Sequence, residues 1–330
     1  MTQCLILPFI QNPSMKKTLL TTFLVVSILA NVHAQNGKIV EQKPYTFPDT
    51  SVALIKRTVP SINNLIANVD FFKIVYLSDG LKVNGYMAIP KKAGKFPCVI
   101  YNRGGNRDFG MITENSLARF LGEIANWNYV VVASQYRGTA GGEGKEEFGG
   151  ADVNDVLNLM PLLANVEKAD TTRIGMYGWS RGGMMTYLAL TKTDRIKAAI
   201  IGSGLTDATE TVKKRPEMDS LFTEIIPGYA ADKDTILKSR SAIQWADKLN
   251  KSTPILILTG SADWRVSPDQ QLEMVKKLYE LRHPVRFHLF EGGQHSLAEH
   301  AREVNHTTKL FLDHYVRDGK KWPDMQPHGD

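Results

Sequence analysis

Ser180 stands in the short motif Gly-Trp-Ser-Arg-Gly, which occupies residues 178–182. The motif follows an apolar run that suits a strand and precedes a run that suits a helix. A serine on a tight strand-to-helix turn, with glycine two residues before and after it, is typical of a nucleophile elbow. The glycines are needed because the turn strains the backbone at the serine, and larger side chains beside it would collide. A motif this short also arises by chance, so on its own it only nominates Ser180 as a nucleophile.

A serine hydroxyl is a poor nucleophile until a neighbouring base takes its proton, so the motif needs a histidine and an acid that orients it. In folds with such an elbow, these partners follow the serine in the order acid, then histidine, each on a loop after a strand. Asp263 follows the strand predicted at 254–259, and His295 follows the strand predicted at 285–289. Their order and positions predict a catalytic triad of Ser180, Asp263 and His295.

Other acidic and histidine residues suit structural roles better. Asp269 begins the next predicted helix, where a carboxylate caps free N–H groups. His288 lies inside a predicted strand, where a packed or edge position is expected. Three more histidines lie on the last predicted helix, at spacings that do not match a zinc-binding HExxH pair: His300, His306 and His314. The expected chemistry needs neither a metal ion nor an organic cofactor.

Attack on an acyl carbonyl also requires two donors for the oxyanion that develops. One is expected to be the backbone N–H of Arg181, directly after the nucleophile. The other is expected from the glycine-rich turn at 102–106, where either Arg103 or Gly104 can supply it. A plain glycine turn is the structural alternative for this segment.

Strands and helices alternate along most of the chain. Strands are predicted at 72–77, 81–89, 97–101, 129–134, 173–177, 196–202, 254–259 and 285–289, and helices at 114–127, 151–163, 269–282 and 298–316. Near-continuous apolar strands separated by helices indicate a mostly parallel sheet with helices on both faces. The first two strands flank Asp79-Gly80, so they form a hairpin and add antiparallel strands at the N-terminal edge. The predicted fold class is therefore α/β.

Two segments fall outside this alternation. Residues 35–70 are polar and weakly patterned, and we expect them to be an extension ahead of the domain at 71–330. Residues 204–250 are polar and charged, and we expect a small cap-like insertion over the carboxyl edge of the sheet, where α/β folds bind ligands. Phe222 and Tyr229 in this insertion are candidates for shaping the substrate pocket.

The first 34 residues have the features of a signal peptide. A positive region at Lys16-Lys17 precedes an apolar stretch at 19–30, and cleavage is expected after Ala34. We expect translation to begin at Met15 and the mature protein to be secreted or periplasmic, without a stable membrane span. An uncleaved membrane anchor is the alternative.

Composition narrows the possible partners. The chain has 330 residues and a formal charge of +6, but its basic residues are scattered, so a nucleic-acid groove is not indicated. Its two cysteines are Cys4 and Cys98, and no disulfide is expected because Cys4 precedes the expected start. Cys98 lies in a predicted buried strand and suits a core position. A small peptide or ester is the expected substrate, and the oligomeric state is not predicted.

With these motifs in place, the chain resembles the catalytic domain of the prolyl oligopeptidase family of serine peptidases, which has an α/β-hydrolase fold. The resemblance rests on 102–105, 135–144, 149–156, the elbow, 240–243, 260–266 and 292–295, in this order. It implies that Ser180 is the nucleophile, Asp263 the orienting acid and His295 the base. It also implies that Val266 lines the hydrophobic pocket for the residue before the scissile bond.

The chain departs from the family's pattern in ways that bear on specificity. The family usually has a β-propeller ahead of the catalytic domain, and residues 35–70 are too few for one. Its first oxyanion motif often reads HGGP or YAGP, where this chain has Arg103-Gly104-Gly105-Asn106, and tyrosine often stands where this chain has Arg181. Arginines there would favour a negatively charged substrate, or else they form structural ion pairs. A peptidase is the preferred prediction, with a carboxylesterase and a non-catalytic binding module as alternatives.

Overall fold

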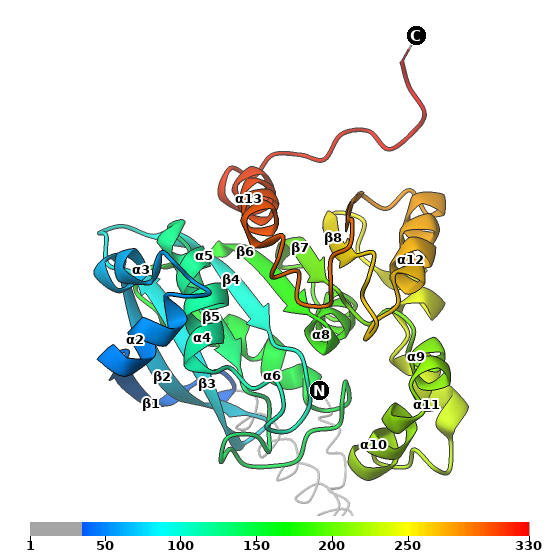
Figure 1. Cartoon of the computed structure of the whole chain (residues 1–330), viewed down its shortest axis with the longest axis horizontal. Coiled ribbons are helices and arrows are strands. Elements are labelled where there is room, and N and C mark those ends of the chain that lie inside the picture. The colour runs from blue at the N-terminus through cyan, green and yellow to red at the C-terminus, as the bar shows by residue number, and fades with distance from the viewer. Residues whose placement is uncertain (1–34, 330) are drawn as a thin grey trace, which may run out of the picture.

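The computed structural model describes residues 35–329, which are shown in Figure 1. Within these residues the strands form one nine-stranded sheet in the order β1-β2-β3-β5-β4-β6-β7-β8-β9. The strands are β1 Ile39–Tyr45, β2 Val69–Ser78, β3 Leu81–Pro90, β4 Phe96–Asn102, β5 Val130–Ser134, β6 Ala169–Trp179, β7 Ile196–Gly202, β8 Ile255–Gly260 and β9 Val285–Phe290. Neighbours from β5 through β4 to β9 are parallel, whereas β1, β2 and β3 pair antiparallel and β3 joins β5 antiparallel. The predicted α/β class and α/β-hydrolase fold are confirmed.

Helices cover both faces of the sheet, as the apolar strands require. One face packs against α6 Val153–Leu157, α7 Leu159–Leu163, α8 Arg181–Leu190 and α12 Pro268–Glu280. The other face packs against α2 Asp49–Ile55, α3 Ile62–Asn68, the continuous run α4 Glu114–Ser116, η1 Leu117–Gly122 and α5 Glu123–Asn126, and the closing helices α13 Ala301–Leu312 and η4 Asp313–Arg317. Two hydrophobic cores therefore lie back to back across the sheet.

Three predicted helices differ from simple α-helices, and the one predicted at 298–316 begins at Ala301 and ends in the π-helical turn η4. The helix predicted at 114–127 has a π-helical middle turn, η1. The helix predicted at 151–163 is divided at Asn158 into α6 and α7. Pro161 accounts for the division, because its ring lacks an N–H and would collide with the carbonyl of Leu157 in a continuous helix.

The segment at 35–70 is part of the sheet. Its first half forms β1, which pairs with β2 and becomes the edge strand, so the predicted hairpin lies one strand further in. Its second half forms α2 and α3, whose Ile55, Ile62 and Leu65 are buried.

The segment at 204–250 carries its own short helices beside the carboxyl ends of β7 and β8 (Figure 1). They are α9 Ala208–Lys214, α10 Glu217–Ile225, α11 Lys233–Ser239, η2 Ala242–Gln244 and η3 Ala246–Lys248. The segment packs into the same core as α8 and α12.

The signal-peptide prediction falls on residues 1–34, which lie outside the described residues. Between residues 35 and 329, no helix combines the length and apolar character needed to cross a membrane.

Candidate active site

Ser180 lies at the carboxyl end of β6, on the turn into α8. Its backbone has φ 57° and ψ −122°, a conformation that is costly for a residue with a side chain. A Cβ atom on Gly178 would come within 2.1 Å of the Gly182 carbonyl oxygen, and one on Gly182 within 1.9 Å of the Asn102 carbonyl oxygen. The strain at the serine and the steric need for both glycines match what the motif predicts.

Asp263 and His295 come together from loops after neighbouring strands, β8 and β9. Asp263 Oδ2 lies 2.8 Å from His295 Nδ1, and the carboxyl side chain is fully buried. The other carboxylate oxygen, Oδ1, accepts the backbone N–H groups of Arg265 and Val266 at 2.9 and 3.0 Å. These bonds hold the carboxylate in one orientation, so it can fix the orientation of the imidazole in turn.

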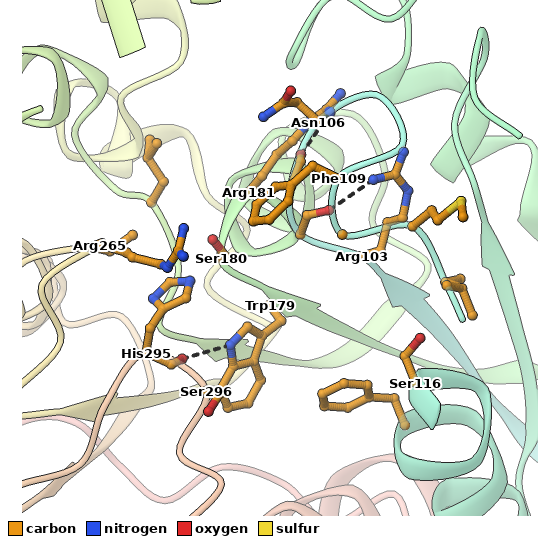
Figure 2. Close-up of a pocket in the computed structure, with 18 of the residues that line it drawn as sticks. Arg103, Asn106, Phe109, Ser116, Trp179, Ser180, Arg181, Arg265, His295 and Ser296 are labelled. Atoms are coloured by element: carbon orange, nitrogen blue, oxygen red, sulfur yellow. Dashed lines mark hydrogen bonds between the residues drawn. The ribbon is translucent and has the colours of Figure 1, made fainter. Parts of the chain in front are cut away.

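The backbone of His295 is held as well, from the strand that carries the nucleophile. Trp179, directly before the nucleophile, donates its indole N–H to the His295 carbonyl oxygen at 3.0 Å. Ser180 and His295 both line one cavity of about 520 Å³ at the carboxyl edge of the sheet (Figure 2). The hydroxyl, the imidazole and the carboxylate predicted to act together are thus gathered at one site.

Both predicted sources of the second oxyanion donor lie on the turn after β4. Gly104 lies close to the nucleophile, since a Cβ atom built on it would lie 3.1 Å from Ser180 Cβ and 3.7 Å from Ser180 Oγ. Among residues 35–329, the Gly104 backbone N–H has no hydrogen-bond acceptor. Arg181 is the first residue of α8, where backbone N–H groups lack partners within the helix. Both N–H groups therefore lack a competing acceptor in the part of the chain that the structure describes, and their role as oxyanion donors stays a prediction.

Arg181 and Arg103 both border the cavity, but their side chains are buried and bonded to other groups of the protein. Arg181 pairs with Glu146 at 2.8 Å and with Asp152, and these are structural ion pairs. Arg103 donates to carbonyl oxygens, including that of Gln135 at 2.7 Å. The negatively charged substrate considered for these two arginines therefore gains no support from their placement.

The three candidate substrate-binding residues have different positions. Val266 lines the cavity, as the resemblance implies. Phe222 and Tyr229 do not line it; both are buried in the core that the 204–250 segment shares with α8 and α12. Phe222 instead packs against Phe148 with ring centroids 4.9 Å apart, and Phe148 lines the cavity. The insertion reaches the cavity through a different set: Leu205, Thr211, Arg215 and Met218.

Several cavity residues have no role in the sequence-based prediction. Phe109 and Met111 are exposed and stand on the loop after the oxyanion turn. Arg265 lies in the cavity beside His295, with its guanidinium 4.6 Å from the Trp264 ring and 5.7 Å from the Phe109 ring (Figure 2). Gly105 and Gly110, on either side of Phe109, were a possible sequence signal for this loop, because glycines often mark positions of positive φ. Both glycines do have positive φ in the structure.

The alternative acids and bases lie elsewhere. Asp269 is in the first turn of α12 and pairs with Lys214, while Ser267 caps the helix. His288 is on β9, and His300 precedes α13. In residues 35–329, no group of histidine, cysteine, aspartate and glutamate side chains is arranged to hold a metal ion.

Comparisons with known proteins agree with this geometry. A sequence model of the prolyl oligopeptidase family matches residues 118–320. An uncharacterised peptidase of Bacillus subtilis, YtmA, is 32% identical over 70% of this chain and 86% of its own length. Dipeptidyl aminopeptidase BIII of Pseudoxanthomonas mexicana is 28% identical over 57% of this chain and 29% of its own.

Solved structures have the same fold. The Pyrococcus horikoshii acylaminoacyl peptidase superposes with a TM-score of 0.66 at 21% identity, over 78% of this chain and 43% of that one. A puromycin-hydrolysing peptidase of Mycobacterium tuberculosis gives a TM-score of 0.63 at 24% identity, over 72% and 38%. The chain thus spans most of the small Bacillus relative but less than half of these longer peptidases.

Proposed function

The chain belongs to the prolyl oligopeptidase family of serine peptidases, and on this basis we propose that Ser180, His295 and Asp263 are its catalytic triad and that it hydrolyses peptides. The observation that carries the proposal is the 2.8 Å contact between Asp263 and His295, because His295 lines the same cavity as the strained Ser180. An acid, an imidazole and a hydroxyl on three strand ends are the groups that the nucleophile–base–orienter arrangement of acyl transfer requires.

In the proposed mechanism, Asp263 keeps the proton of His295 on Nδ1, which leaves Nε2 free to accept the Ser180 proton. The Ser180 oxygen then attacks the acyl carbonyl and forms a tetrahedral intermediate. The backbone N–H groups of Arg181 and Gly104 receive the developing negative charge. The imidazolium protonates the leaving amine, and the acyl group stays on Ser180 as an ester. Water then attacks this ester while His295 takes its proton, and the return of that proton to Ser180 releases the acid.

The proximity to Ser180 favours Gly104 over Arg103 as the second donor. The Arg103 carbonyl oxygen already accepts the Tyr136 hydroxyl on the side away from the cavity. Val266 lines the cavity, which supports the contact with the acyl-side residue of the substrate that the resemblance implies.

The names of the relatives support short peptides as substrates. Those relatives include dipeptidyl aminopeptidases and acylaminoacyl peptidases, although this chain spans less than half of their length. A panel that compares peptide amides with short acyl esters tests the choice of substrate. Turnover of esters without any amide would instead identify a carboxylesterase.

The triad is tested by Ser180→Ala, with Ser252→Ala as a matched control. Ser252 lies in the turn before β8, at the opposite edge of the sheet. We expect Ser180→Ala to abolish turnover and labelling by a fluorophosphonate probe, while Ser252→Ala keeps both. Undiminished labelling of a folded Ser180→Ala protein would refute the proposal.

A further inference from the structure

The turn that carries the proposed second oxyanion donor is held from inside the molecule by a tyrosine. Tyr136 follows β5, is completely buried, and donates its hydroxyl proton to the Arg103 carbonyl oxygen at 3.0 Å. This carbonyl belongs to the same peptide unit as the N–H of Gly104.

A trans peptide is planar, with its C=O and N–H pointing in opposite directions. Because the buried Tyr136 holds the Arg103 carbonyl toward the protein interior, the Gly104 N–H points in the opposite direction, away from Tyr136. Gly104 lies close to Ser180, and its N–H has no acceptor among residues 35–329. The hydroxyl of Tyr136 therefore sets the direction of the N–H that an oxyanion would meet.

The tyrosine ring itself is tightly held. The guanidinium groups of Arg103 and Arg181 each lie 4.9 Å from its centroid, and Arg181 is fixed by Glu146 and Asp152. Its backbone has φ 64°, and its N–H donates to Ser134 Oγ at 2.9 Å, which stabilises this unusual conformation. Burial raises the pKa of Tyr136 well above its ordinary range, so the hydroxyl remains a donor.

The two arginines hold the rest of the turn. Arg103 donates to the carbonyl oxygens of Gly104 and Arg107, both at 3.0 Å. Arg181 donates to the Gly105 carbonyl oxygen, also at 3.0 Å (Figure 2). Glu146, which pairs with Arg181, accepts the Arg107 N–H at 2.7 Å.

We propose that Tyr136 is a positioning residue for the catalysed reaction: its hydroxyl aims the Gly104 N–H at the oxyanion formed when Ser180 attacks. The inference rests on the proposed function, because it requires a tetrahedral intermediate at Ser180. Tyr136 does not touch the substrate, so its effect belongs to the transition state and not to substrate binding.

The test is Tyr136→Phe, which removes only the hydroxyl. Tyr129→Phe is the matched control, because Tyr129 is equally buried and donates to Asp313 at 3.0 Å at the other end of β5. We expect kcat of Tyr136→Phe to fall about tenfold to a hundredfold, somewhat less than the loss of a whole oxyanion donor. KM should stay within about twofold, and the affinity for a peptidyl trifluoromethyl ketone, which forms a tetrahedral adduct, should fall with kcat.

Equal kcat values for the two tyrosine variants would overturn the inference, as would a lower kcat with unchanged affinity for the ketone. If Tyr136→Phe does not fold, Arg181→Lys serves instead. It removes the guanidinium group that packs on the Tyr136 ring and donates to the Gly105 carbonyl oxygen. A folded Arg181→Lys with wild-type kcat and ketone affinity would then refute it. Ser180→Ala separates the two proposals: if that variant is inactive and Tyr136→Phe is normal, only this inference fails.

Discussion

The carboxylate of Asp263 accepts two backbone N–H groups through one oxygen and faces His295 with the other. Asp263→Asn should keep the bonds from the Arg265 and Val266 N–H groups but present an amide NH2 to His295 Nδ1. The proton of the imidazole would then lie on Nε2, which could no longer accept the Ser180 proton. We expect kcat to fall by about four orders of magnitude, as in the measured serine-protease case, with little loss of stability. Steady-state kinetics and urea unfolding would check this, and a variant with more than a tenth of wild-type kcat would contradict it.

At the scale of single residues, the sequence predicts positions better than partners. Asp263 and His295 could be placed together because both follow strands that end at the same edge of a parallel sheet. The partners of Arg181 could not be predicted, because Glu146 and Asp152 lie on a segment whose path depends on the finished fold. Phe222 and Tyr229 show the same limit, since aromatic residues in an insertion suit a pocket and a core equally well.

At the scale of elements, the turn between α12 and β9 contains a buried imidazole. His283 is 1% exposed, its Nε2 lacks a hydrogen-bond partner within the described residues, and burial lowers its pKa from 6.5. The unfolded chain therefore binds this proton more readily than the folded protein. The free energy of unfolding should rise with pH up to about 6.5 and fall as the pH drops below that value.

Replacing His283 with asparagine should make this pH dependence shallower below about pH 6.5. Urea unfolding at a series of pH values measures the slope. Some slope should persist, because burial also lowers the pKa of His288. An unchanged slope in the asparagine variant would show that His283 does not contribute.

Some strands and helices can be predicted from the local sequence pattern, and others cannot. All eight predicted strands are present: the inner parallel strands are apolar runs that the sheet buries, β2 and β3 alternate between buried and less buried residues, and β9 buries only Phe290. The edge strand β1 was not predicted, since its mostly exposed sequence becomes a strand only by pairing with β2. The π-helical turns η1 and η4 were also missed, because a π-turn leaves the apolar spacing of a helix almost unchanged.

At the scale of the whole molecule, the sheet joins every part of the described chain into one structure. β4 is central to this arrangement, with β5 and β6 on either side and a hydrophobic core on each face. The candidate site depends on this construction, because the oxyanion turn follows β4 and Ser180 follows β6. An opening that exposes β4 would therefore separate the two halves of the site.

Cys98 makes this opening measurable. It lies in β4 with no exposed surface, and burial raises the pKa of its thiol to about 12, so the folded protein should contain almost no reactive thiolate. A protein that begins at Gln35 has Cys98 as its single cysteine. We expect a thiol reagent to label it fully in denaturant and, under native conditions, only at the rate set by global unfolding.

The labelling rate should rise with urea with the same dependence as the unfolding equilibrium, because no smaller opening exposes the centre of the sheet. Rapid, urea-independent labelling of the native protein would show instead that β4 opens locally, and the two halves of the site would then not be held by one cooperative structure.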